Sequence, residues 1–180
     1  MKVNITNMKN VFVFKNNTFY DERGFLKRVI CKKDLKKIFN INFDIKKTNY
    51  SFNLKKYTLR GFHYQKKPFE EDKVITCING KVYDIVLDLR PKSKSFLNWT
   101  SLILDSNRNE SLFIPKGCAN AWITLQNNTS LIYHHSQFYK PKHELSIRYN
   151  DPKFEFQWPK KPHIISSKDK NIANFKLENL

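Results

Sequence analysis

The sequence predicts an all-β fold, an antiparallel sandwich or barrel of jelly-roll type with short peripheral helices. Short apolar runs recur at regular spacing between glycine, proline and asparagine turns, a pattern typical of such folds. Fifteen phenylalanines and eight tyrosines favour strands, because aromatic side chains pack well on a pleated surface. Asn79-Gly80 is the strongest hairpin signal and joins two long apolar runs, which we expect to pair.

The first part of the chain supplies the strands that lead to this hairpin. The expected elements are, in order, a strand over 11–14, a tight turn at Gly24, a short helix capped by Asp34, a strand or loop over 45–53, and strands over 59–65 and 73–78. Alternation places Arg60 and Phe62 on one face and His63 on the other. Lys73 shares a face with Ile75. The charged loop 66–72 is expected to be flexible.

The second part of the chain continues the same pattern. We expect strands over 81–90, 96–105, 111–115, 118–125 and 130–139, a closing segment over 144–152, and a last short helix capped by Ser166 or Ser167. Asp84 lies within an apolar run, where a buried charge needs a partner. Tyr133 and His135 are two residues apart, so a strand directs both side chains to one face.

Length and composition predict one domain over residues 1–180. The hydrophobic fraction of 40% is enough to bury a core. The three cysteines lack CxxC spacing, which argues against a disulfide framework or zinc site and for a cytoplasmic location. No apolar run reaches membrane-spanning length and the start lacks the apolar segment of a signal peptide, so we expect no membrane association.

The net charge of +17 raises the question of nucleic-acid binding. The lysines are spread through the chain, without a long basic block or an RNA-binding aromatic signature, so we expect no nucleic-acid partner. Tight, salt-sensitive binding to any duplex would contradict this expectation. The positive field instead favours an anionic small molecule such as a diphosphate.

Three side chains are candidates for proton chemistry. A lone histidine is more often structural than catalytic, and a strand tyrosine usually packs, so His63 and Tyr133 alone say little. Lys73 is more informative, because a lysine among apolar strand residues needs a partner or a function. We expect His63 and Lys73 to face one cavity. A metal site is disfavoured, since GFHYQ lacks the second histidine that a metal-binding jelly roll needs.

The motifs in combination resemble the dTDP-4-dehydrorhamnose 3,5-epimerase family. The matching segments follow the family's order over nearly the whole chain: DERGF, TNYS, LRGFHYQ, the Lys73 strand, NGKVYDIVLDLR, FIPKGCANAW, LIYHHSQFYKP, IRYNDP and SSKD. The resemblance implies a cupin-like double-stranded jelly roll and a homodimer without cofactor or metal. It further implies an isomerase that acts on a nucleotide-linked 4-keto-6-deoxy sugar, in deoxysugar biosynthesis for surface polysaccharide such as lipopolysaccharide.

The resemblance assigns four catalytic roles. Epimerisation beside a ketone needs a base on one face, an acid on the other and a cation at the enolate oxygen. By resemblance, His63 is the base and Asp169 orients it and stabilises its imidazolium form. Lys73 hydrogen-bonds the carbon-4 oxygen, and Tyr133 delivers a proton from the opposite face.

The resemblance also implies a substrate-binding set. Arginine suits a diphosphate because its planar guanidinium donates two hydrogen bonds at once. Two members, Arg23 and Phe25, are expected to come from the partner subunit. The full set is Arg23, Phe25, Asn49, Arg60, Gln65, Asn120, Tyr139, Glu144 and Lys168.

Two positions depart from the family pattern. Asn120 stands where most members carry a histidine, and Lys47 stands where a glutamine is common. The sugar, the nucleotide (dTDP, GDP or CDP) and the number of inverted centres therefore stay open. The alternatives are a single-centre epimerase, a 3,4-ketoisomerase of a related sugar, and a non-catalytic jelly roll that binds sugar nucleotides.

Overall fold

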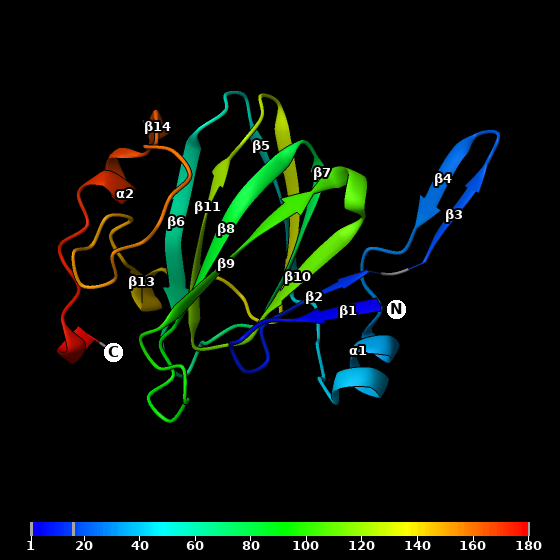
Figure 1. The fold of residues 1–180 in the computed structure, drawn as a ribbon. Coiled ribbons are helices and arrows are strands. Elements are labelled where there is room, and N and C mark those ends of the chain that lie inside the picture. Colours follow the sequence, from blue (N-terminus) through cyan, green and yellow to red (C-terminus); the bar gives the residue numbers. More distant parts are fainter. Residues whose placement is uncertain (1, 16, 180) are drawn as a thin grey trace.

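In the computed structural model, which describes residues 2–15 and 17–179, two antiparallel sheets face each other and a small hairpin extends away from them (Figure 1). The first sheet has the strand order β1 (Lys2–Ile5), β2 (Phe12–Lys15), β10 (Glu110–Ile114), β7 (Lys73–Asn79), β12 (Thr129–His135) and β5 (Lys47–Asn53). The second has the order β13 (Glu144–Ser146), β6 (Thr58–Gln65), β11 (Cys118–Thr124), β8 (Lys81–Asp88) and β9 (Trp99–Asp105). The predicted antiparallel all-β fold is confirmed.

The remaining elements lie at the periphery of the two sheets. They are the hairpin β3 (Thr18–Asp21) and β4 (Gly24–Lys27), the helices α1 (Lys32–Phe39) and α2 (Ser167–Lys170), the 3₁₀ turns Ser106–Arg108, Pro141–His143 and Leu177–Asn179, and β14 (Ile164–Ile165), which runs parallel to β6. The helix α1 begins before Asp34, with Cys31 at its N-cap, so the predicted Asp34 cap is wrong. The Asp34 carboxylate lies in the first turn instead, where it complements the helix dipole.

The core lies between the sheets and explains why Asn79-Gly80 is not a hairpin turn. Strands β7 and β8 belong to different sheets, so the predicted pairing of these two strands is wrong. Ile75 from β7 and Val82 from β8 are both fully buried in the same core. This packing requires the chain to cross from one sheet to the other. Gly80 allows the crossing with φ +79°, and a Cβ there would lie 2.5 Å from Thr129 Oγ1.

The C-terminal segment covers the outer face of the second sheet. Phe154 and Phe156 pack on Phe62 of β6 and on Ile85 and Leu87 of β8. Phe62 stacks on Phe156 with ring centroids 4.4 Å apart. This layer makes both faces of the second sheet buried and fixes the path of the chain toward α2. No helix in the described part of the chain is long and apolar enough to cross a membrane.

Asp88, at the end of β8, is a buried carboxylate with several donors. It accepts hydrogen bonds from the Arg90 side chain and from the hydroxyls of Ser93 and Ser95. Burial raises the pKa of Asp88, but these hydrogen bonds outweigh it and lower the pKa to about 2. The charged form is therefore favoured in the folded state by on the order of 2 kcal/mol.

The Asp88 cluster predicts a specific loss of stability in acid. Because the folded pKa is depressed, the contribution is complete above the unfolded pKa of about 4 and is lost as the pH falls toward 2. Asp88→Asn should lower the free energy of unfolding at pH 7 and flatten its dependence on pH between about 4 and 2. Urea unfolding at pH 7 and at several pH values between about 4 and 2 measures both effects. Asp44→Asn, at an exposed ion pair, is the control and should change little.

Candidate active site

A cavity of about 670 Å³ lies between the two sheets. His63 and Lys73 both line it, which confirms the prediction that these two side chains face one cavity. Strands of both sheets and the segment from β14 to α2 line it. The expected site residues in its wall are His63, Lys73, Tyr133, Asp169, Asn49, Arg60, Asn120, Tyr139, Glu144 and Lys168.

An extra residue in β6 sets the direction of the site residues on that strand. His63 pairs with Asn120 and Arg60 pairs with Trp122, so three steps along β6 match two along β11. Arg60 and His63 consequently both face the cavity, whereas Phe62 packs on the outer face. The predicted alternation between Arg60 and His63 is therefore wrong.

Gly61 makes this irregularity possible. A Cβ at Gly61 would lie 2.6 Å from Ala121 Cβ and from the Asn120 carbonyl oxygen, and its φ is +113°. Both features exclude larger side chains. The glycine of the LRGFHYQ motif thus directs His63 and Arg60 into the same cavity.

A partly exposed imidazole, His63, pairs with a buried carboxylate, Asp169. His63 Nε2 lies 2.8 Å from Asp169 Oδ1, and the Ser166 hydroxyl caps α2 by accepting from the Asp169 backbone N–H, which confirms one of the two predicted caps. Burial raises the pKa of Asp169, but the hydrogen bond with His63 and the His63 charge, together with the hydrogen bonds from Gly61 and Ser166, outweigh it and hold the pKa below its ordinary value. A carboxylate only accepts, so Nε2 carries the proton and Nδ1 is available as a base.

Replacing the Asp169 charge should weaken this base without removing it. Asp169→Asn keeps the side-chain volume but removes the charge that stabilises the imidazolium, so we expect turnover to fall about 10- to 100-fold. Steady-state kcat and kcat/KM of the wild type and of Asp169→Asn measure the change. An unchanged kcat would contradict the pairing.

Lys73 lies at the centre of a cluster of buried polar residues. Its Nζ donates to the His63 carbonyl oxygen at 3.0 Å and to Asn120 Oδ1 at 3.2 Å. Asn120 Nδ2 lies 3.5 Å from Asp84 Oδ2. Burial lowers the pKa of Lys73 and raises the pKa of Asp84 well above its ordinary value. Asn120 therefore bridges a buried amine and a buried acid.

Tyr133 reaches the cavity from the other sheet. Its strand β12 lies in the first sheet, and β6, which carries His63, lies in the second. Burial raises the pKa of Tyr133, and the Arg60 charge and a hydrogen bond with Asn49 offset this only in part. The Tyr133 ring meets Trp122 edge-on at 5.6 Å. The phenol therefore keeps its proton at neutral pH and can serve as a donor.

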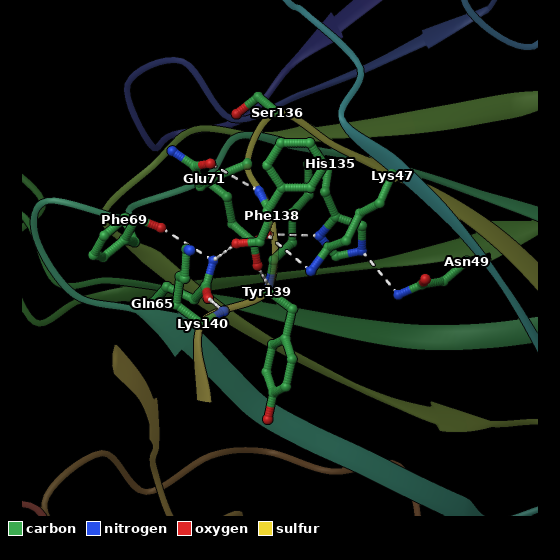
Figure 2. A network of polar contacts seen from close by, with 12 residues as sticks. Lys47, Asn49, Gln65, Phe69, Glu71, His135, Ser136, Phe138, Tyr139 and Lys140 are labelled. Atoms are coloured by element: carbon green, nitrogen blue, oxygen red, sulfur yellow. Dashed lines mark hydrogen bonds and ion pairs between the residues drawn. The ribbon is translucent and has the colours of Figure 1, made fainter. Parts of the chain in front are cut away.

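Three expected substrate-binding residues lie away from this cavity. Gln65 is buried and joins two loops, donating to the carbonyl oxygens of Phe69 and Phe138 and accepting from the Lys140 backbone N–H (Figure 2). All its polar atoms are thus engaged in structure, and its assignment as a pocket residue is wrong. Arg23 and Phe25 lie on the exposed β3–β4 hairpin, which extends away from the two sheets (Figure 1), and neither residue lines the cavity.

The cavity also contains polar residues that sequence reasoning did not assign to it. Glu71 and His135 line it and hydrogen-bond through Glu71 Oε2 and His135 Nδ1 at 2.9 Å (Figure 2). His135 follows Tyr133 by two residues on the same face of β12, and this spacing could have predicted that His135 lines the cavity. No spacing in the sequence points to Glu71, because the charged loop 66–72 is predicted to be flexible. In the structure Glu71 is buried. Lys47 lies beside them, 3.7 Å from Glu71.

The fold and the cavity define an acid–base enzyme of the jelly-roll class. An imidazole on one sheet, and a protonated phenol and a lysine on the other, are the groups that proton transfer beside a carbonyl requires. The model of the dTDP-4-dehydrorhamnose 3,5-epimerase family matches residues 5–177. The chain therefore belongs to this family of isomerases, and its fold is the cupin-type jelly roll of the family's structures.

Individual relatives match the chain over nearly its whole length. The dTDP-4-dehydrorhamnose 3,5-epimerase of Escherichia coli K12 is 30% identical, covering 100% of this chain and 96% of that protein. The Bacillus anthracis enzyme with TDP and PPi bound is 30% identical with a TM-score of 0.92, covering 97% of this chain and 99% of that one. The Streptomyces bikiniensis 3'-monoepimerase in complex with dTDP-quinovose is 25% identical with a TM-score of 0.87, covering 94% and 85%.

Proposed function

We propose that this protein epimerises carbon 3, carbon 5 or both in a nucleotide-linked 4-keto-6-deoxy sugar. The observation that carries the proposal is that His63 and Tyr133 line one cavity from opposite sheets. Lys73 lines the same cavity from the sheet that carries Tyr133. Inversion requires a proton to leave one face of a carbon and another to arrive on the opposite face. Two groups on facing sheets meet this requirement.

The proposed reaction removes one proton from a sugar carbon and adds another, so the composition of the sugar does not change. His63 Nδ1 takes the proton from the carbon beside the ketone, and the electron pair of that C–H bond delocalises onto the ketone oxygen as an enolate. Lys73 stabilises the negative charge at this oxygen, and Asp169 stabilises the imidazolium. Tyr133 then gives its hydroxyl proton to the opposite face of the carbon. Solvent restores the protonation states of the imidazole and the phenol.

The nucleotide is proposed to bind at the cationic part of the cavity. Arg60 and Lys168 both line the cavity; Arg60 Nε donates to Asn53 Oδ1 at 2.8 Å, and Lys168 pairs with Glu144. These cations suit a diphosphate. The TDP and dTDP-sugar bound by the relatives support a nucleotide carrier, with dTDP as the first candidate and GDP and CDP as alternatives.

A homodimer is proposed to complete the site. Phe19, Phe25 and Leu26 on the β3–β4 hairpin are exposed, as are Tyr50 and Phe52 on the outer face of the edge strand β5. Apolar surface of this extent favours association. In the dimer, Arg23 and Phe25 of each subunit would contact the nucleotide in the other. Arg23→Ala should therefore raise KM about tenfold and leave kcat nearly unchanged, while sedimentation still shows a dimer. An unchanged KM would remove Arg23 from the site.

Asn120 bears on how many centres the enzyme inverts. It cannot accept and return a proton at neutral pH as a histidine can. The 3'-monoepimerase among the relatives supports a single-centre reaction as the second candidate.

We place the enzyme in the cytoplasm, in deoxysugar biosynthesis for surface polysaccharide.

Product analysis tests the proposed function. The protein is incubated with nucleotide-linked 4-keto-6-deoxy sugars carried by dTDP, GDP and CDP, and the product stereochemistry is read by NMR. Inversion at carbon 3, carbon 5 or both supports the proposal and decides the number of centres. A 3-keto product would instead show a 3,4-ketoisomerase, and binding without any product would show a non-catalytic protein.

A further inference from the structure

A row of ionisable side chains crosses the floor of the cavity beside the proposed acid. His135 on β12 pairs in register with Lys47 on β5 and with Lys73 on β7, so the three side chains lie next to one another on one face of the sheet. All three line the cavity together with Glu71. The two lysines flank His135 and repel each other, and a buried lysine loses its charge unless an anion compensates for the lost hydration.

Glu71 contacts every member of this row. Its Oε1 lies 3.7 Å from Lys73 Nζ, and its Oε2 lies 2.9 Å from His135 Nδ1 and 3.7 Å from Lys47 Nζ. The side chains of Glu71 and Lys73 are each only 7% exposed, so solvent screens their interaction weakly. His135 Nε2 lies 3.4 Å from Asn49 Nδ2, which leaves Nδ1 as the protonated nitrogen that donates to Glu71 (Figure 2).

We propose that Glu71 supplies the negative charge that keeps Lys73 protonated at neutral pH, and that neutral His135 holds the Glu71 carboxylate in place. Glu71 is thus a positioning residue that acts through Lys73. Its consequence for catalysis rests on the function proposed above, because a charged Lys73 is needed there at the enolate oxygen. The charge state of Lys73 itself can be measured without a substrate.

Asp84 is the competing source of negative charge, and its surroundings argue against it. It is completely buried, and its Oδ1 has no hydrogen-bond partner within the described residues. Burial raises its pKa well above the ordinary value. At Glu71, burial also raises the pKa, but the hydrogen bond from His135 and the lysine charges outweigh it and lower the pKa. Glu71 is therefore the carboxylate that stays ionised.

The electrostatic environment of Lys73 comes from several elements. Burial lowers its pKa, Glu71 and Asp84 raise it, and Lys47 lowers it. The ionisable groups that act on it are Glu71 in the loop before β7, Asp84 on β8, Lys47 on β5, His135 on β12 and Cys118 on β11. The two carboxylates are the only ones of these that favour the charged amine, so they form a matched pair for a test.

The test titrates Lys73 directly by NMR. The full-length protein is labelled with ¹³C at the lysine ε-carbon, and the Lys73 resonance is identified by its absence in Lys73→Met. Glu71→Gln keeps the shape and can still accept from His135, but removes the charge. We expect it to lower the titration midpoint of Lys73 by at least about one pH unit. Asp84→Asn, the equivalent change at the other carboxylate, should lower it by less than half as much.

Two results would overturn the proposal. One is an unchanged midpoint in folded Glu71→Gln, and the other is a larger fall in Asp84→Asn. Lys47→Met provides a test that does not depend on the folding of the carboxylate variants, because Lys47 is partly exposed. Removing this repelling charge should raise the Lys73 midpoint, and a fall would contradict the proposal. Failure of the substrate assay would reject the proposed function but leave these titrations unaffected.

Discussion

His63→Ala should lower epimerisation by at least about a thousandfold, since general-base catalysis contributes 10²- to 10⁴-fold. The alanine variant loses both the basic nitrogen and the hydrogen bond to Asp169. Deuterium incorporation at the sugar carbons should fall with turnover, because both depend on the same proton abstraction. Measuring the two rates in parallel separates loss of the base from a slow later step.

A second substitution controls for structural damage at this position. His63→Gln can still donate a hydrogen bond to Asp169 but has no basic nitrogen. It should be as inactive as the alanine variant and should unfold at nearly the wild-type temperature. Retention of more than a tenth of wild-type turnover in either variant would remove His63 from its assigned role.

Tyr133→Phe should separate the two halves of the reaction. The variant keeps His63 and Lys73, so the enolate still forms and returns, but the opposite face has lost its proton donor. We expect epimerisation to fall about 100-fold or more, while exchange of a sugar proton with solvent continues within about tenfold of the wild-type rate. NMR in heavy water follows exchange and inversion in the same sample.

Tyr139→Phe is the matched control for this prediction. Tyr139 also lines the cavity, but its hydroxyl donates to Glu144 and its ring lies near the opening, half exposed. Its loss should change KM more than kcat and should leave inversion coupled to exchange. If Tyr133→Phe reduces neither inversion nor exchange, Tyr133 is not the acid.

Short apolar runs between turns predicted the fold class but not the pairing of the strands. Such runs mark β7 and β8 as strands, and the Asn79-Gly80 turn matches a hairpin. The same pattern also fits two strands in facing sheets, because each contributes one face to a shared core. Local sequence does not distinguish these arrangements, since the choice depends on contacts with β10, β11 and β12 far along the chain.

The candidate site was predictable where a motif fixed the backbone and was missed where burial depended on distant segments. The LRGFHYQ motif contains the glycine that the irregularity in β6 requires, so His63 and Arg60 were correctly placed at the cavity even though their predicted faces were wrong. Gln65, in the same motif, instead donates hydrogen bonds to the carbonyl oxygens of Phe69 and Phe138 in two loops. Glu71 is buried against His135, Lys73 and Lys47, which come from three strands that are far apart in the sequence.

Deuterium exchange by the wild-type protein is the most direct test of the central claim, that one cavity removes and returns protons beside a ketone. The protein is incubated in heavy water with nucleotide-linked 4-keto-6-deoxy sugars, and the proton signals of the sugar ring are followed by NMR. We predict loss of the signal at carbon 3, carbon 5 or both, with the other ring signals unchanged and the inverted product accumulating. Retention of both signals with every nucleotide carrier, in a sample that binds the sugar nucleotide, would contradict it.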